Sequence, residues 1–211
     1  MNYYAFISYS DKDKEWAIWL QHELEHYHLP ASFNGRSDVR DNLREVFRDW
    51  NGLSAGLEWD KQVKPILKET TNLIVICSPN ARESKPIEKE IKTFLASGKE
   101  DNIYPFIVEG DKPYECFPPS LKKSKVGGDV NKDGRDAAFI KIVAGMLNLE
   151  FPDLYNRYEL EKAEQERKER EQKEKLQTAV GRFVGEKAMN LIEDGDSYLA
   201  AAVILGAVVK Y

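Results

Sequence analysis

The apolar run at residues 72–77, Asn-Leu-Ile-Val-Ile-Cys, constrains the fold more than any other feature of the sequence. It is continuous and rich in β-branched residues, which is typical of a strand that is buried on both faces. Ser78, Pro79 and Asn80 follow it and end the run. Strands of this kind lie in parallel sheets that are covered by helices on both sides. The run therefore predicts an α/β domain.

Strand-like and helix-like segments alternate on either side of this run. The predicted strands are residues 3–7, 45–48 and 103–108, of which 45–48 is the weakest. Apolar residues at helical spacing predict helices over residues 13–27, 57–67, 87–95 and 139–147, whereas residues 114–130 are expected to be irregular. Pro65 is expected to kink its helix or to end its pattern early. The alternation predicts βαβ units over residues 1–150, with any small-molecule site at the carboxyl edge of a parallel sheet.

The sequence changes character after residue 150. Residues 154–178 hold seven Lys or Arg and seven Asp or Glu, several of them in favourable i,i+4 pairs such as Glu164 and Lys168. This pattern lacks an apolar heptad seam, so it predicts a solvated connecting helix rather than a coiled coil. Residues 179–211 are apolar again, and they predict either a helical hairpin or the start of a further helical region.

Composition argues against several classes of protein. The net charge of −5 without a strong basic patch makes nucleic acid a poor candidate partner. Cys77 and Cys116 are the two cysteines and lie far apart, which fits a reducing, cytoplasmic location better than a disulfide framework. The first residues do not resemble a signal peptide. The apolar run at 198–209 is shorter than the roughly 20 residues that span a bilayer. There is also no Gly-rich dinucleotide loop or phosphate loop.

Two groups of residues resemble metal sites only in part. Asp129, Asn131 and Asp133 match the first half of an EF-hand loop, but Ile140 stands at the twelfth position, where the bidentate Glu belongs. His22 and His26 have the spacing of a shared metal site on one helix, without an evident Cys or carboxylate partner. We therefore expect a polar loop and a surface histidine cluster, and no metal.

Four segments meet at the predicted carboxyl edge, because loops at this edge converge on one crevice in doubly wound sheets. They are residues 6–10, 47–49, 77–79 and 83–90. In the last segment, Glu88 and Glu90 flank the apolar stripe of the helix on opposite sides, since successive residues turn by about 100°. Either carboxylate can face the crevice, and periodicity does not choose between them.

The same segments resemble the Toll/interleukin-receptor (TIR) domain family of the bacterial type. The matching stretches are YAFISYSDKD, FRDWNGLSAG, LIVICSPNARESKPIEKEI and ECFPPSL, in the order of the family's motifs, and they cover about residues 3–150. The resemblance implies a flavodoxin-like parallel sheet flanked by helices, here followed by a C-terminal helical extension. It further implies self-association through TIR–TIR contacts, and either adaptor signalling or cleavage of NAD+ at the bond between nicotinamide and ribose. In bacteria such domains often serve anti-phage defence.

The resemblance also implies roles for individual residues. It identifies Glu90 as the catalytic carboxylate, in a motif where Pro86 stands in place of the usual Trp. The residues that it implies for substrate binding are Phe6, Ser8, Tyr9, Ser10, Arg48, Asp49 and Ser84. NAD+ is then the substrate, and no further cofactor is expected.

One carboxylate suffices for this chemistry. Nicotinamide leaves as a neutral molecule, so no general acid is required, and the transition state resembles a ribosyl oxocarbenium ion. A carboxylate near the ribose stabilises that charge. The alternative function is a non-catalytic adaptor or scaffold. The sequence does not distinguish linear from cyclic ADP-ribose as the product.

Overall fold

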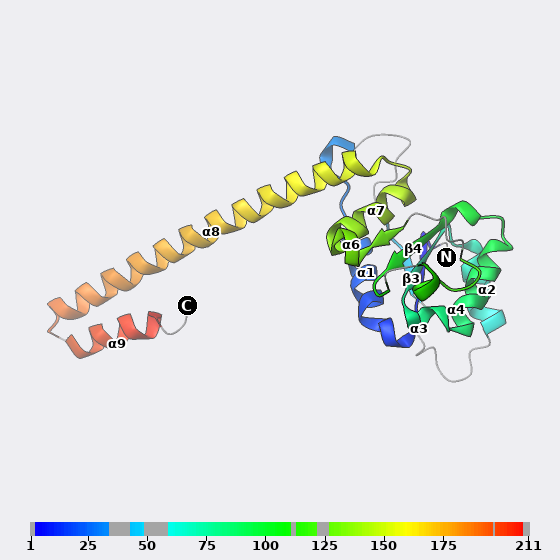
Figure 1. Cartoon of the computed structure of the whole chain (residues 1–211). Coiled ribbons are helices and arrows are strands. Elements are labelled where there is room, and N and C mark those ends of the chain that lie inside the picture. Colours follow the sequence, from blue (N-terminus) through cyan, green and yellow to red (C-terminus); the bar gives the residue numbers. More distant parts are fainter. Residues whose placement is uncertain are drawn as a thin grey trace. The chain divides into compact units, whose positions relative to one another are not determined.

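The computed structural model describes residues 3–33, 43–48, 59–110, 113–121, 127–195 and 197–208 (Figure 1). The candidate substrate residue Asp49, in the stretch FRDWNGLSAG, lies outside the described residues. The chain divides into two compact units, Met1–Tyr158 and Glu159–Tyr211, which are described separately below.

The first unit is built on a five-stranded parallel sheet with the strand order β2-β1-β3-β4-β5. The strands are β1 (Ala5–Ser8), β2 (Val46–Arg48), β3 (Asn72–Cys77), β4 (Ile103–Ile107) and β5 (Gly128–Asp129). All six residues of β3 are buried, as the continuous apolar run predicts. The arrangement confirms the predicted flavodoxin-like fold class.

Helices cover both faces of this sheet (Figure 1). The helices are α1 (Lys14–His26), α2 (Trp59–Glu69), α3 (Pro79–Arg82), α4 (Lys85–Leu95), α5 (Pro113–Cys116), α6 (Val130–Asp133) and α7 (Arg135–Leu147). Short 3-10 helices occur at Asp11–Asp13, Ala31–Phe33 and Glu100–Asn102. Residues of α1 and α7 form one apolar cluster with the sheet, and residues of α2, α3, α4 and α5 form the other. Alternate strand residues supply the two clusters: Ile7 belongs to the first and Phe6 to the second.

Helix α2 corrects one expectation. It runs from Trp59 to Glu69 through Pro65, which is exposed and does not end the helix. A proline inside a helix costs about 3 kcal/mol because it removes one backbone hydrogen bond. Val63 and Leu67 are both buried in the core on the same helix, and their burial offsets this cost.

The stretch expected to be irregular contains the edge strand β5. Its two consecutive glycines explain why the sequence pattern did not reveal it. A Cβ on Gly127 would lie 2.0 Å from the carbonyl oxygen of Pro105, and a Cβ on Gly128 would lie 2.2 Å from that of Ala138. The strand thus depends on the close approach of β4 and α7, which only glycine permits here.

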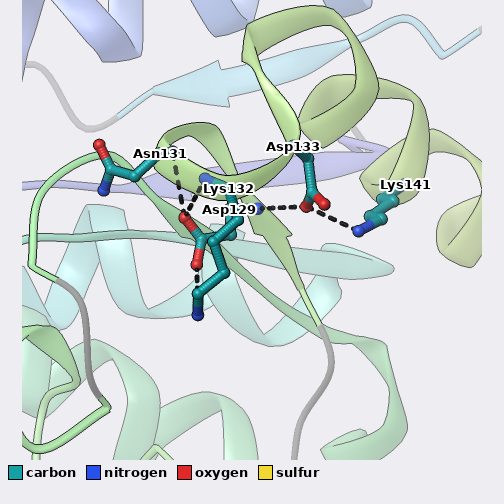
Figure 2. A network of polar contacts seen from close by, with 5 residues as sticks. All are labelled: Asp129, Asn131, Lys132, Asp133 and Lys141. Atoms are coloured by element: carbon teal, nitrogen blue, oxygen red, sulfur yellow. Dashed lines mark hydrogen bonds and ion pairs between the residues drawn. The ribbon is translucent and has the colours of Figure 1, made fainter.

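A network of polar contacts fixes the segment that resembles half of an EF-hand (Figure 2). The Asp129 carboxylate accepts hydrogen bonds from the backbone N–H groups of Asn131 and Lys132, at 3.1 and 3.2 Å, and caps α6. The side-chain Nζ of Lys132 forms an ion pair of 3.0 Å with Oδ2 of Asp129, and Nζ of Lys141 forms one of 2.6 Å with Oδ2 of Asp133. These carboxylates are therefore engaged in capping and ion pairing.

After the sheet, helix α8 (Phe151–Glu193) is continuous over 43 residues, and α9 (Ser197–Val208) follows a short turn. The charged segment and the first helix of the expected hairpin thus form one helix. In the second unit, Ala188 and Ala200 are buried, whereas Phe183 and Tyr198 are exposed. Within the described residues, no helix combines the length and the apolar character that a membrane crossing requires.

Candidate active site

Helix α4 buries a carboxylate among apolar side chains. Its N-terminus is capped by Ser84, and its buried face comprises Ile87, Glu90, Ile91 and Phe94. The Glu90 residue is only 3% exposed. Glutamate is seldom buried to this extent without a partner, because removing a charge from water is costly.

Ser8 provides such a partner from the end of β1. Its hydroxyl donates a hydrogen bond of 2.5 Å to Oε2 of Glu90. Ser8 is fully buried and is the last residue of its strand, so the contact lies at the carboxyl end of the parallel sheet. Phe6 lies two residues earlier on the same face, where it is fully buried and packs against Phe47 with ring centroids 5.2 Å apart. It supports the Ser8–Glu90 contact from the core.

Glu88 occupies a different environment on the same helix. One of its carboxylate oxygens accepts from the Ser120 hydroxyl at 2.5 Å and pairs with Lys92 at 3.0 Å. The other oxygen accepts from the Ser120 backbone N–H at 3.0 Å. Partial burial by itself raises the pKa of Glu88, but the hydrogen bonds from Ser120 and Lys92 outweigh it and lower the pKa below its ordinary value. Glu88 therefore fastens α4 to the turn at residues 118–121.

Arg48 lies at the end of β2 with two buried donors that lack an acceptor. Among the residues that the structure describes, its Nε and Nη1 have no hydrogen-bond partner. A buried, unsatisfied donor costs about 1–3 kcal/mol, so these groups favour an incoming acceptor. Arg48 pairs in register with Ile7, one residue before Ser8. Because strand side chains alternate between faces, Arg48 and Ser8 start on opposite faces, and a ligand touching both must cross the carboxyl edge.

The other predicted substrate residues lie in varied positions. Tyr9 is buried in the cluster on the α1 and α7 face, across the sheet from Glu90. Ser10 is half-buried, and its carbonyl accepts from the Asp13 N–H at 2.8 Å. Ser84 accepts from the Ile87 N–H at 3.5 Å as the cap of α4. Contact of these residues with a substrate stays a prediction.

The family comparison agrees with this geometry. The TIR domain family model matches residues 5–143, which include the whole sheet and α4. The chain belongs to the TIR domain family. A curated relative, NAD(+) hydrolase ApTIR from an Actinoplanes species, is 30% identical over 112 residues. This match covers 53% of the present chain and 15% of the relative, so the chain spans only a small part of that protein's length.

A second buried polar pair at the carboxyl edge of this TIR domain was not predicted. The Ser78 hydroxyl donates a 2.6 Å hydrogen bond to the Asp13 carboxylate and accepts from the Ala81 N–H at 3.1 Å. Burial raises the pKa of Asp13, although the hydrogen bonds from Ser78 and Asn80 act against it. The pair joins the segment after β1 to the end of β3. The sequence signal was the Ser-Pro step at residues 78–79, which indicates a helix cap but not its distant partner.

In the described part of the TIR domain, the cysteines and the stacked histidines do not form a competing site. Burial raises the pKa of Cys77 well above its ordinary value and that of Cys116 to about 11, so both thiols are poor nucleophiles. The rings of His22 and His26 stack with centroids 4.2 Å apart. Among the residues that the structure describes, no group of three or more His, Cys, Asp or Glu is arranged to hold a metal ion.

Proposed function

We propose that this TIR domain cleaves NAD+ at the bond between nicotinamide and ribose, with Glu90 as the catalytic carboxylate. The observation that carries the proposal is the Glu90 side chain, buried at the carboxyl end of β1 and held by Ser8 at 2.5 Å. Crevices outside the carboxyl ends of strands are the usual ligand sites of open α/β sheets. The relative named as an NAD(+) hydrolase supports the same activity.

The reaction requires one main contribution from the protein, which is stabilisation of the positive charge on the ribosyl group. As the bond between the ribose carbon and the nicotinamide nitrogen breaks, its electron pair leaves with nicotinamide, which becomes neutral. The ribosyl group then carries the positive charge, which the Glu90 carboxylate stabilises. Water adds to the ribose carbon and releases a proton, which yields ADP-ribose. Attack by the adenine ring instead of water would give the cyclic product, so product analysis distinguishes these outcomes.

Arg48 is proposed to bind the substrate rather than to act in bond cleavage. Its Nε and Nη1 are buried donors without an acceptor, and a guanidinium group matches the geometry of a phosphate. The diphosphate of NAD+ supplies such acceptors. In this proposal the substrate crosses the carboxyl edge, with its ribose near Glu90 and its phosphates near Arg48.

The burial of Glu90 supports activation by self-association. A carboxylate that is 3% exposed is not accessible to NAD+ in solution, so the residues that cover Glu90 must move before NAD+ binds. TIR–TIR contacts between copies of the chain would provide that opening, and without these contacts the isolated chain would not consume NAD+. We further propose that this controlled activity serves bacterial anti-phage immunity.

The test is NAD+ cleavage as a function of protein concentration. We expect nicotinamide release that rises more steeply than in proportion to the concentration of the purified chain, and none from Glu90→Ala at any concentration. Chromatography of the products reports linear or cyclic ADP-ribose. Absence of cleavage by the wild-type chain in its assembled state, shown by light scattering on the same sample, would refute the enzyme and leave the scaffold function.

A further inference from the structure

A cavity of about 630 Å³ lies on the face of α4 that points away from the sheet. It is lined by residues of α2, α3 and α4, by Glu83, Ser84 and Ala96 next to these helices, and by Pro119. Neither Glu90 nor Ser8 lines it, because both lie on the buried side of α4. The volume is in the range of small-molecule sites, which is about 300–1,000 Å³.

The sequence, with its net charge of −5, was expected to have no strong basic patch, but the lining of this cavity is strongly basic. Its cationic side chains are Lys64, Lys68, Arg82, Lys85, Lys89 and Lys92, against the carboxylates of Glu83 and Glu88. Glu88 is already engaged by Ser120 and Lys92. The positive charges therefore outnumber the negative ones, and one of the two carboxylates is already occupied.

The cationic side chains of the lining differ in whether a carboxylate neutralises their charge. Lys64 forms an ion pair of 3.0 Å with Asp60, which does not line the cavity. The Lys89 Nζ lies 3.6 Å from the centre of the Trp59 ring, and this contact does not neutralise the positive charge of Lys89. Lys68, Arg82 and Lys85 form no ion pair with any residue in the described part of the chain. These three uncompensated cations come from three different helices and line one cavity.

Local helix energetics do not explain this arrangement. Cations are stabilised near the C-termini of helices and disfavoured near their N-termini by the helix dipole. Lys68 is in the last turn of α2, where the dipole favours it, but Lys85 is the first residue of α4, where the dipole opposes it. Like charges gathered at one cavity also repel each other, and a bound anion relieves that repulsion.

We propose that this cavity is a second ligand site, separate from Glu90, for a small molecule that carries at least two adjacent phosphate groups. Arg82 offers a planar fork that suits phosphate oxygens, whereas Lys68 and Lys85 act as point charges. The site rests on the cavity and its charges alone, and so it does not depend on the proposed NAD+ cleavage.

The first experiment is calorimetric titration of the full chain with pyrophosphate, ADP and adenosine. We expect saturable binding of pyrophosphate and ADP that weakens as salt is raised, and no binding of adenosine. The triple variant Lys68→Gln/Arg82→Gln/Lys85→Gln is expected to bind both phosphorylated ligands at least about tenfold more weakly. A matched triple variant on α8, Lys168→Gln/Arg170→Gln/Lys173→Gln, removes the same charge and is expected to bind them like the wild type.

Hydrogen exchange of the unaltered chain with pyrophosphate locates the site without relying on a variant. Protection confined to α2, α3 and α4, and unchanged in Glu90→Gln, is the expected result. The proposal is overturned by absence of saturable pyrophosphate binding, by equal loss of binding in the two triple variants, or by protection that lies elsewhere. A chain that binds pyrophosphate here but cleaves no NAD+ would leave this proposal standing while the proposed function fails.

Discussion

Two carboxylates on α4, two residues apart, lie in contrasting surroundings. The Glu88 side chain is 19% exposed, and both of its oxygens are bound by Ser120 while Lys92 pairs with one of them. Glu90 is 3% exposed and is bound by Ser8 at the carboxyl end of β1. Both carboxylates are largely buried and hydrogen-bonded, so these two properties do not by themselves identify a candidate catalytic residue. What separates them is position: Glu88 joins two surface elements, and Glu90 lies at the edge where α/β sheets bind ligands.

The largest expected effect separates the two residues by activity. Glu90→Gln keeps the shape of the side chain but removes the charge, so we expect NAD+ cleavage to fall by at least about 100-fold, as when a group that stabilises transition-state charge is lost. Glu88→Gln should change the rate by less than about threefold, since its side chain lies on a different face of α4, where it binds Ser120. Nicotinamide release by chains of equal thermal stability measures both. Equal losses of activity in the two variants would show that the two carboxylates do not differ in function.

The Ser8–Glu90 contact should appear as a coupling in stability. Ser8→Ala leaves a buried carboxylate without one donor, and we expect it to cost about 1.5–3 kcal/mol of unfolding free energy. In the Glu90→Gln background the cost should fall by about 1 kcal/mol or more, whereas in the Glu88→Gln background it should be unchanged. Urea denaturation of the single and double variants gives these values. Additivity with Glu90→Gln would mean that the hydrogen bond contributes little.

Arg48→Gln should affect substrate binding more than bond cleavage. If its buried Nε and Nη1 donors bind the phosphates of NAD+, the variant should raise KM by roughly tenfold and leave kcat within about threefold. Arg48→Lys retains the charge but not the planar fork, and should recover part of the loss. Steady-state kinetics on the three chains decide this. A fall in kcat at constant KM would instead assign Arg48 to the transition state.

The smallest expected effect is the pH-dependent stabilisation by Glu88. Its pKa is lowered in the folded chain, so the unfolded chain binds more protons and the stabilisation is present at pH 7. It is lost as the pH falls below about 4.5, the ordinary pKa of this group, and through the folded-state pKa. We expect Glu88→Gln to lower Tm at pH 7 by roughly 2–4 °C. Thermal unfolding from pH 7 to pH 3 should show this gap closing, and a constant gap would contradict the account.

The sequence predicted those features that depend on local pattern. The continuous run at Asn72–Cys77 indicated the parallel sheet, and the structure buries all six of its residues. Periodicity left Glu88 and Glu90 undecided, because their difference comes from Ser120 and Ser8, which lie far away along the chain. Only the resemblance to the TIR family favoured Glu90, and a catalytic role for it stays a prediction.

Features that depend on contacts between residues far apart in the sequence were not predicted. The edge strand β5 exists because Gly127 and Gly128 let the chain approach Pro105 and Ala138, which no local pattern records. The Asp13–Ser78 hydrogen bond joins residues 65 positions apart. Pro65 was expected to kink its helix or to end its pattern early. The early end was wrong, because the tertiary burial of neighbouring apolar residues outweighed a local preference, whereas the kink stays a prediction.

The central claim is that the Glu90 carboxylate faces the ribose of bound NAD+. The most direct test is a crystal structure of the assembled chain with an NAD+ analogue whose ribose ring oxygen is replaced by a methylene group, which resists cleavage. We expect a Glu90 oxygen within about 3.5 Å of the ribose and the diphosphate close to Arg48. An analogue bound away from the carboxyl edge, with Glu90 still buried and hydrogen-bonded to Ser8, would contradict the catalytic role of Glu90.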